Sequence, residues 1–169
     1  MKFNPNLVQT RYDSPLGPML LAATEHGLAG VWFDDQRHLP EGAHDWPAQP
    51  DHPVLQEAIA QLDDYFAGRR QDVGLPLDLR GGTAFQQAVW RALLAIPRGQ
   101  TLSYGALAQR IGKPAAVRAV GAAVGRNPAS IVVPCHRVLG QGGALTGYAG
   151  GLARKTALLR LEGAQAVGA

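Results

Sequence analysis

Residues 103–125 read SYGALAQRIGKPAAVRAVGAAVG, and their pattern is the most informative in the second half of the chain. Ser103 is a typical N-cap for a short helix with one apolar face, which Gly112 would end. Pro114 favours the start of another helix, because proline is well tolerated at the first helical position. Two helices joined by a turn of about three residues that contains glycine predict a helix-turn-helix.

A further helix should precede this motif. Thr83 is a plausible N-cap, and Phe85, Val89 and Leu93 repeat with helical spacing. Pro97 then closes the helix, so the second half of the chain is mostly helical.

The first half has a different pattern. Short runs of apolar residues separated by turn formers predict a small antiparallel sheet. Its strands are expected at Leu7–Tyr12, Met19–Ala23 and Leu28–Phe33. After a surface loop over 36–53, apolar residues at helical spacing predict an amphipathic helix over Leu55–Phe66. The chain should therefore have an α+β fold, with a small N-terminal sheet-and-helix domain and a helical C-terminal domain.

Charge changes sign between the halves. Of the 169 residues, 46% are hydrophobic and 17% charged, which is the balance of an ordinary globular protein. Residues 1–80 carry 12 acidic and 6 basic residues (net −6), whereas 81–169 carry 10 basic residues and one acid (net +9). We therefore place the domain boundary near residue 80. A basic half favours a polyanionic partner such as nucleic acid, although a solvated basic face would look the same.

Several classes of protein are excluded by what the sequence lacks. No run of about 18 apolar residues predicts a membrane span, and the N-terminus has no apolar signal core, so we expect a cytoplasmic protein with no membrane partner. One cysteine excludes an internal disulfide and a multi-cysteine zinc site. The glycine-rich stretch LGQGGALTGYAGG at 139–151 matches neither nucleotide-binding fingerprint, so no cofactor and no metal are expected. It could offer backbone groups to a planar ligand, with Tyr148 as a wall, or simply form a hairpin turn.

The second helix of the predicted motif has one unusual face. Around Arg118 the helical neighbours are Ala115, Gly121, Ala122 and Gly125, so a single cation stands on a smooth surface. Such a face could enter a groove as narrow as the minor groove of DNA, about 6 Å wide. Alternatively, the small residues only allow close helix packing.

Cys135 and His136 are the candidate chemical groups. A thiolate is the nucleophilic form of cysteine, and a nearby imidazole or cation lowers the pKa of the thiol. In an extended segment the two side chains would point to opposite faces, so a bridging water or a bend would have to connect them. A cysteine after three β-branched residues could equally be an inert core residue.

Glu162 is the only acid of the basic half. It shares a helix face with Leu158 and Leu159, near the C-terminal end of the last predicted helix, where burial and the helix dipole both disfavour a carboxylate. Unless it is a frayed surface residue, Glu162 should have a partner. Cys135, His136 and Glu162 then form a candidate relay, because a carboxylate commonly orients a catalytic imidazole.

The motifs of the second half, taken in order, resemble those of the O-6-alkylguanine-DNA alkyltransferases. The resemblance rests on Ser103-Tyr104, Arg118-Ala119-Val120-Gly121, Asn127-Pro128, Pro134-Cys135-His136-Arg137-Val138, Gly147-Tyr148-Ala149-Gly150-Gly151 and Leu161-Glu162-Gly163. It implies a DNA repair protein that transfers the alkyl group of O-6-alkylguanine, and of O-4-alkylthymine, irreversibly to its own cysteine. The acidic first half also resembles the N-terminal domain of the family, by pattern more than by motif.

The resemblance implies a role for each matched residue. Cys135 would accept the alkyl group, with its thiolate formed through a water by His136, which Glu162 orients. Tyr104 would donate toward the departing base, and Asn127 would brace the turn between the recognition helix and an active-site strand. The base would be held by Val138, Tyr148, Ala149 and Gly150. DNA would be bound by Arg118, Tyr104, Ser103, Ala119, Gly121 and Arg126.

The implied partner is double-stranded DNA approached from the minor groove, with Arg118 replacing a flipped nucleotide. Base flipping costs a few kcal/mol, which phosphate contacts could offset. We expect a monomer in solution that can cluster on DNA. Some relatives have a serine where this chain has Ala149, so only the backbone there could contact the base.

Three other functions compete with this interpretation. A non-catalytic alkyltransferase-like protein would only bind lesions, but such proteins lack the cysteine. A cysteine hydrolase would use the same three side chains for many turnovers and would leave the basic half unexplained. A helix-turn-helix regulator would bind DNA by sequence in the major groove.

Overall fold

The computed structural model describes residues 5–164, and the chain folds into two compact units. One comprises Met1–Gly82 with Pro128–Val132, and the other Thr83–Asn127 with Val133–Ala169. The first four residues of the predicted domain 1–80 and the last five of the predicted domain 81–169 lie outside the described part. The first unit is a small sheet with a helix and the second is mostly helical, so the predicted α+β fold class is confirmed.

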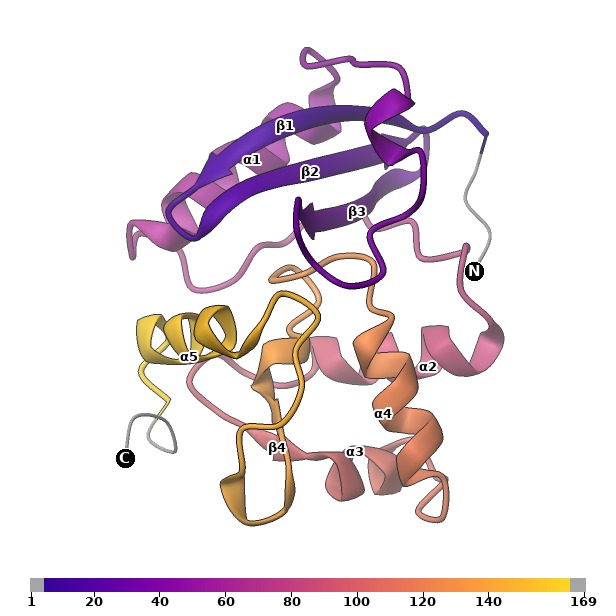
Figure 1. Cartoon of the computed structure of the whole chain (residues 1–169), viewed down its shortest axis with the longest axis vertical. Coiled ribbons are helices and arrows are strands. Elements are labelled where there is room, and N and C mark those ends of the chain that lie inside the picture. Colours follow the sequence, from indigo (N-terminus) through magenta and orange to yellow (C-terminus); the bar gives the residue numbers. More distant parts are fainter. Residues whose placement is uncertain (1–4, 165–169) are drawn as a thin grey trace. The chain divides into compact units, whose positions relative to one another are not determined.

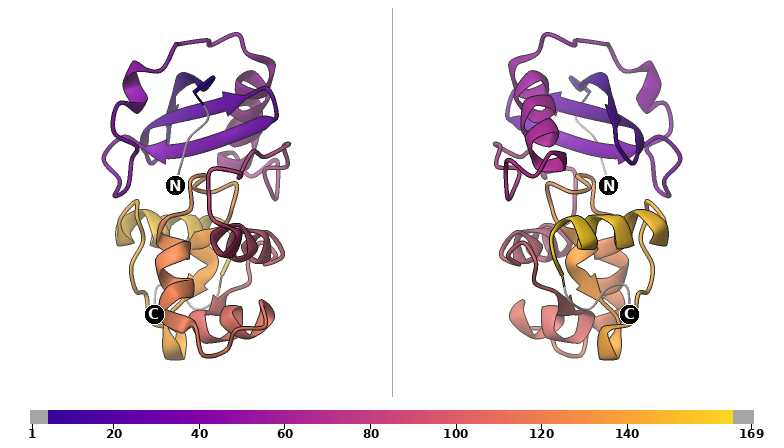
Figure 2. Two further views of the ribbon diagram at one scale, coloured as in Figure 1. Left: turned by 90° about the vertical axis from the view of Figure 1, so that its right-hand side faces the viewer. Right: turned by 90° about the vertical axis from the view of Figure 1, so that its left-hand side faces the viewer.

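The first unit is built on a three-stranded antiparallel sheet of β1 (Val8–Ser14), β2 (Gly17–Thr24) and β3 (Gly27–Phe33), in that order. These strands confirm the predicted meander. Helix α1 (Pro53–Phe66) lies along one face of the sheet (Figures 1 and 2) and buries an apolar stripe that includes Leu55 and Leu62. The opposite face packs Leu20 and Trp32 against Ala43, at the 3-10 turn η1 (Ala43–Asp45).

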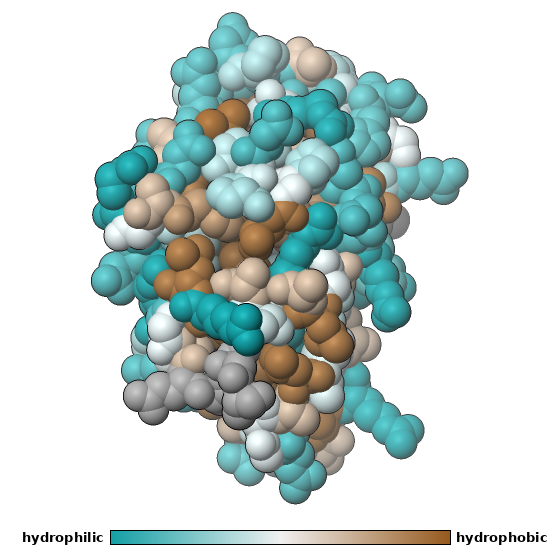
Figure 3. Space-filling view, turned by 60° about the vertical axis from the view of Figure 1, so that its left-hand side comes forward, coloured by the Kyte–Doolittle hydropathy of each residue, from teal (hydrophilic) through white to brown (hydrophobic). Residues whose placement is uncertain are grey.

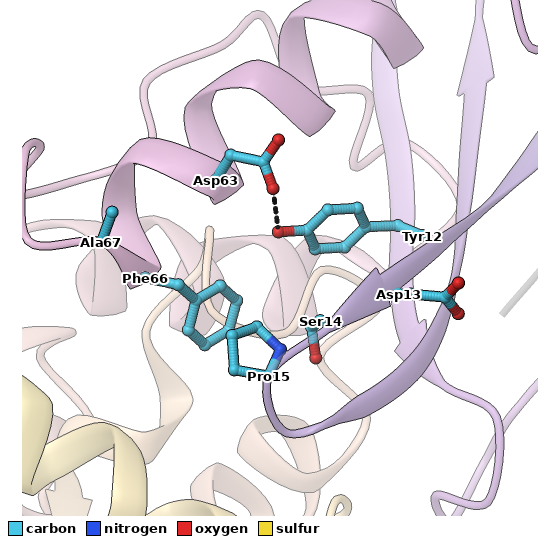
Figure 4. Close-up of a pocket in the computed structure, with 7 residues that line it drawn as sticks. All are labelled: Tyr12, Asp13, Ser14, Pro15, Asp63, Phe66 and Ala67. Carbon is cyan, nitrogen blue, oxygen red and sulfur yellow. Dashed lines mark hydrogen bonds between the residues drawn. The ribbon is translucent and has the colours of Figure 1, made fainter.

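A shallow cavity of about 430 Å³ lies where the β1–β2 hairpin meets the end of α1. In Figure 4 the Tyr12 hydroxyl points at Asp63 on α1, to whose Oδ1 it donates a hydrogen bond of 2.7 Å. Burial and this carboxylate raise the pKa of Tyr12. Since the phenol stays protonated, the bond fastens the strand to the helix.

The segment Pro128–Val132 belongs to the first unit, although it is distant in sequence. It pairs with β3 through Val31, whose N–H donates to Pro128 O (2.8 Å) and whose carbonyl accepts from Ser130 N (3.0 Å). Ile131 follows with φ of 74°, and Val132 N donates to Ser130 O at 2.9 Å. A β-branched residue rarely adopts this left-handed conformation, so the pairing on β3 holds a strained three-residue turn in place.

The second unit contains the helices α2 (Ala84–Leu94), α3 (Tyr104–Arg110), α4 (Val117–Gly125) and α5 (Leu152–Leu161). Short parallel strands β4 (Leu102–Ser103) and β5 (Val138–Leu139) connect them, with 3-10 turns η2 (Cys135–Arg137) and η3 (Gln141–Gly143). Thr83 and Ser103 are the N-caps of α2 and α3, as predicted. Trp90 of α2 donates from Nε1 to Ala123 O of α4 (2.8 Å), which ties the motif to the preceding helix.

Several sequence predictions about this unit are wrong. Helix α4 begins at Val117 and not at Pro114, because Ala116 N bonds to Lys113 O (2.9 Å) in a separate turn. The α3–α4 connection is therefore Ile111–Ala116, longer than the predicted three residues, and Ala115 is not on the helix. The expected extended segment at Cys135 is instead the 3-10 turn η2.

Hydrophilic side chains (teal) surround patches of apolar ones (brown) on the face of the molecule drawn in Figure 3. Among the described residues, the large apolar side chains that are more than one-third exposed are Leu94, Val117 and Leu152. Within the same residues, no helix is both long enough and apolar enough to span a bilayer.

Candidate active site

The chain enters the site through two tight turns around Cys135. Pro134 has φ −82° and ψ 64°, and Cys135 N donates to Val133 O at 2.8 Å, which defines a three-residue turn. Turn η2 follows directly. This local path, which replaces the expected strand, brings the Cys135 and His136 side chains into the interior, where both are buried.

Opposing influences act on the Cys135 thiol. Burial raises the pKa of Cys135, whereas a hydrogen bond from the Asn127 side chain and the charge of Lys155 lower it. Asn127, just after α4, also donates from Nδ2 to Val133 O (2.8 Å). One amide therefore fastens the turn before the cysteine and contacts its sulfur.

His136 and Glu162 are in direct contact within the protein interior. His136 Nε2 lies 2.8 Å from Glu162 Oε2, and neither side chain is exposed. Burial is the main cause that lowers the pKa of His136, so the ring is neutral near pH 7. An ionised carboxylate only accepts hydrogen bonds, so Nε2 carries the proton and donates. Nδ1 is then the accepting nitrogen, and it is buried without a hydrogen-bond partner among the described residues.

Arg137 holds the other side of the same carboxylate. Its Nε donates to Glu162 Oε1 (2.8 Å) and its Nη2 to Oε2 (2.9 Å). Its Nη1 donates to Ile96 O at 2.7 Å, and the side chain is 3% exposed. A two-pronged pair of this kind keeps Glu162 ionised in a site that would otherwise favour protonation.

Like Arg137, Lys155 is a buried cation among the described residues of this unit. It lies on α5 with no exposed surface, and its Nζ donates to Val138 O (2.6 Å), Thr146 O (2.9 Å) and Gly147 O (3.2 Å). Burial lowers its pKa to about 8. Across the described residues no group of His, Cys, Asp or Glu side chains could hold a metal ion.

The residues expected to hold a base all precede Lys155 in sequence. Val138 and Gly150 are buried, whereas Tyr148 and Ala149 are half-buried. Tyr104, at the start of α3, is half-buried, and its pKa is raised mainly by burial and also by the charge of Cys135. A hydrogen bond with Thr146 opposes this shift and connects Tyr104 to the glycine-rich stretch.

The expected DNA-binding residues lie mainly on one helix. Arg118, Ala119 and Arg126 are exposed on α4 or at its end, as is Ala122 of the smooth helix face. Gly121 is less exposed and faces the ring of Tyr104, where an added Cβ would lie 3.8 Å from Cδ1. A groove of about 580 Å³ lies beside this helix. Its lining consists of Ser103, Tyr104, Gly105, Ala106, Gln109, Val117 and Gln141.

The structure thus brings together Cys135, His136, Glu162, Asn127 and Tyr104, while Arg118 and Arg126 lie on the exposed helix and not in the buried cluster. Arg137 and Lys155 also belong to this buried cluster, although no role for either was predicted from the sequence. For Lys155 a signal existed, because it shares a helix face with Leu158, Leu159 and Glu162. For Arg137 the one signal was Glu162, the single acid of the basic half, which called for a cationic partner.

Comparison with known proteins agrees with this geometry. Residues 84–164 match the DNA-binding domain of 6-O-methylguanine DNA methyltransferase, and residues 7–79 match the ribonuclease-like domain of the same protein. The chain is 51% identical over 154 residues to the methylated-DNA–protein-cysteine methyltransferase of Mycobacterium bovis, covering 91% of each chain. It is 47% identical over 152 residues to that of Methanosarcina acetivorans, covering 90% of this chain and 96% of the relative.

Solved structures show the same similarity. The crystal structure of Mycobacterium tuberculosis OGT in complex with DNA superposes with a TM-score of 0.85 at 48% identity, covering 94% of this chain and 96% of that one. The O6-methylguanine-DNA methyltransferase of Pyrococcus kodakaraensis superposes with a TM-score of 0.65 at 26% identity, covering 93% and 99%. The chain therefore belongs to the 6-O-methylguanine DNA methyltransferase family. Its activity is that of a methylated-DNA–protein-cysteine methyltransferase, which repairs DNA by direct alkyl transfer to a cysteine of the protein.

Proposed function

We propose that Cys135 is the acceptor of the alkyl group, and that the substrate is guanine alkylated at O6 in double-stranded DNA. The observation that carries this proposal is the buried series Arg137–Glu162–His136, adjacent to the only cysteine of the chain. It leaves one unprotonated imidazole nitrogen as the base available to the thiol.

In the proposed reaction, Cys135 gives its proton to His136, through a water where the two atoms are not in contact. The sulfur then attacks the alkyl carbon, so that an S–C bond forms while the C–O6 bond breaks and its electron pair leaves with the guanine. Tyr104 donates a proton toward the departing base, and the proton taken from the thiol replaces it. In the net reaction the alkyl group moves to sulfur and a proton moves to guanine.

The thioether product cannot be cleaved by these side chains, so each chain reacts once. No acyl intermediate forms, and the site has no need of an oxyanion hole. This stoichiometry separates the proposal from a cysteine hydrolase, which would turn over many times.

We further propose that α4 enters the minor groove and that the damaged nucleotide rotates out of the duplex. The support is the exposed face of α4, where Arg118 and Arg126 stand beside the small side chains of Ala119 and Ala122. Arg118 fills the space that the base leaves, while Val138, Tyr148, Ala149 and Gly150 hold the base. The arrangement needs only one chain, so the acting species is a monomer.

The test titrates a duplex containing O6-methylguanine against the wild-type protein and against Cys135→Ser. Wild type should restore an amount of guanine equal to the amount of protein and then stop. Cys135→Ser should restore none while binding the duplex with unchanged affinity. Continued turnover by wild type, or repair by Cys135→Ser, would contradict the proposal.

A further inference from the structure

The buried ammonium of Lys155 has no part in the reaction described so far. A lysine ammonium has three N–H donors and no acceptor, and Lys155 Nζ lies within hydrogen-bond distance of three carbonyl oxygens. All of its donors are therefore occupied inside the protein. Lys155 has none left for a substrate and acts only through the groups that it touches.

The three carbonyls belong to two parts of the site. Val138 comes directly after the turn that carries Cys135, whereas Thr146 and Gly147 lie in the glycine-rich stretch 139–151. Within that stretch Gln141–Ala144 are exposed, and Gly142, Gly143 and Gly147 have positive φ. Leu139 and Leu145 pack in an apolar cluster with Leu159, and the hydrogen bonds to one cation fix the glycine-rich part of the stretch at two further points, Thr146 and Gly147.

The same charge acts on the cysteine. Lys155 lowers the pKa of the Cys135 thiol, and the Cys135 thiolate in turn raises that of Lys155. The carboxylate on the same helix, Glu162, is bonded to Arg137 and His136. Once Cys135 gives up its proton, its thiolate is the anion that complements the charge of Lys155.

We propose that Lys155 is a positioning residue for alkyl transfer, whose one buried charge both stabilises the Cys135 thiolate and holds 139–151 against Val138 in the conformation that receives the base. This inference rests on the proposed role of Cys135 as acceptor. No bond to Lys155 forms or breaks during the reaction, and it stays protonated throughout.

Charged and titratable groups around Lys155 come from the turn packed on α5. These are Cys135, His136, whose pKa the lysine lowers, and Arg137, whose charge is directed at Glu162. On 139–151 the groups that contact Lys155 are uncharged carbonyls. Loss of its proton would therefore remove both the charge facing the thiolate and the donors that hold the stretch.

The first test compares wild type with Lys155→Met, which keeps a similar length and removes the charge. Arg160→Met is the matched control, because Arg160 is an exposed cation on the same helix. Reaction of Cys135 with iodoacetamide is followed against pH, since it needs neither DNA nor a bound base. In Lys155→Met, the midpoint of the rise of the iodoacetamide reaction rate with pH should move upward by about one pH unit or more. The reaction at pH 7 should be about tenfold slower.

Transfer from O6-methylguanine should fall further than the iodoacetamide reaction, because the base-binding stretch is also released. Arg160→Met should match wild type in the iodoacetamide profile. An unshifted midpoint in folded Lys155→Met would overturn the electrostatic role, and equal losses in both reactions would overturn the role in holding 139–151.

A second measurement needs no substitution, so it applies even if Lys155→Met does not fold. In wild type the transfer rate should turn downward above about pH 8, where Lys155 loses its proton, while the iodoacetamide reaction continues to rise. Parallel rises of the two rates up to about pH 9.5 would contradict the inference. Failure of wild type to transfer methyl to Cys135 at all would instead contradict the proposed function.

Discussion

Arg137 and Glu162 are joined by two hydrogen bonds in the protein interior, from Nε to Oε1 at 2.8 Å and from Nη2 to Oε2 at 2.9 Å. This pair explains how a carboxylate stays ionised at the C-terminal end of α5, where burial and the helix dipole both oppose its charge. Glu162 Oε2 also accepts the hydrogen bond from His136. The tautomer of the imidazole therefore depends on Arg137, although the arginine takes no part in the reaction itself.

Arg137→Met should therefore impair both stability and repair. It leaves Glu162 buried without its cationic partner, which costs about 3–5 kcal/mol of unfolding free energy when a buried pair is broken. Protonation of Glu162 would relieve part of this cost and leave His136 without an anion to fix its tautomer, so methyl transfer should slow by about 10²-fold. Urea unfolding and single-turnover kinetics measure the two effects. Arg91→Met, at an exposed arginine of α2, is the control and should change neither the unfolding free energy nor the transfer rate. Transfer by Arg137→Met at the wild-type rate would contradict the role assigned to Arg137.

The substitution Arg118→Ala should slow the repair of duplex DNA more than the reaction with the free alkylated base. If Arg118 fills the space of a flipped nucleotide, its loss removes a contact worth a few kcal/mol, so repair of a duplex should slow by about tenfold or more. Reaction with free O6-methylguanine should change by less than about twofold. Arg110→Ala, at an exposed arginine of α3, is the control. Equal losses on both substrates would contradict the role assigned to Arg118.

Arg126→Gln should lower the salt dependence of DNA binding. Arg126 is exposed at the end of α4, where a phosphate contact would release counterions. The slope of log affinity against log salt concentration should become shallower by about 0.9, equally for damaged and undamaged duplexes. Fluorescence anisotropy over a series of salt concentrations gives this slope, and an unchanged value would show that Arg126 makes no phosphate contact.

Stability of the protein should depend on Asp78 in acid. Hydrogen bonds from Arg80, and a weaker contribution from Thr24, lower the pKa of Asp78 to about 2. Because the pKa is lower in the folded state than its ordinary value of 3.8, the stabilisation is present above about pH 4 and is lost as the pH falls toward 2. The substitution Asp78→Asn should lower the free energy of unfolding by about 1–2 kcal/mol at pH 7 and by almost nothing near pH 2. Urea unfolding of wild type and Asp78→Asn between pH 2 and 7 measures this difference, with Asp51→Asn at an exposed aspartate as control. A difference in unfolding free energy that does not change with pH would contradict the prediction.

Local signals explain what could be predicted from the sequence. Thr83 and Ser103 cap helices where expected, because a side-chain oxygen bonds to a nearby backbone N–H whatever the rest of the chain does. The alternation and turns of the first 33 residues likewise define the β meander. The start of α4 was misplaced because Pro114 is an equally good residue for the turn that precedes the helix.

Features that depend on distant partners could not be predicted in this way. The path from Ile131 to Cys135 is set by pairing of Pro128–Val132 with β3, which lies almost 100 residues earlier. The apolar run before the cysteine therefore looked like a strand. Likewise, Arg137 and Lys155 read as ordinary basic residues until their buried acceptors were known.

Mass spectrometry of wild-type protein mixed with excess O6-methylguanine duplex shows whether Cys135 is the acceptor of the methyl group. After digestion, the peptide containing Cys135 should carry one added methylene group, in one copy per chain, and the DNA should contain a matching amount of restored guanine. A modification on another peptide, or repaired guanine in excess of the protein with Cys135 unmodified, would contradict the account.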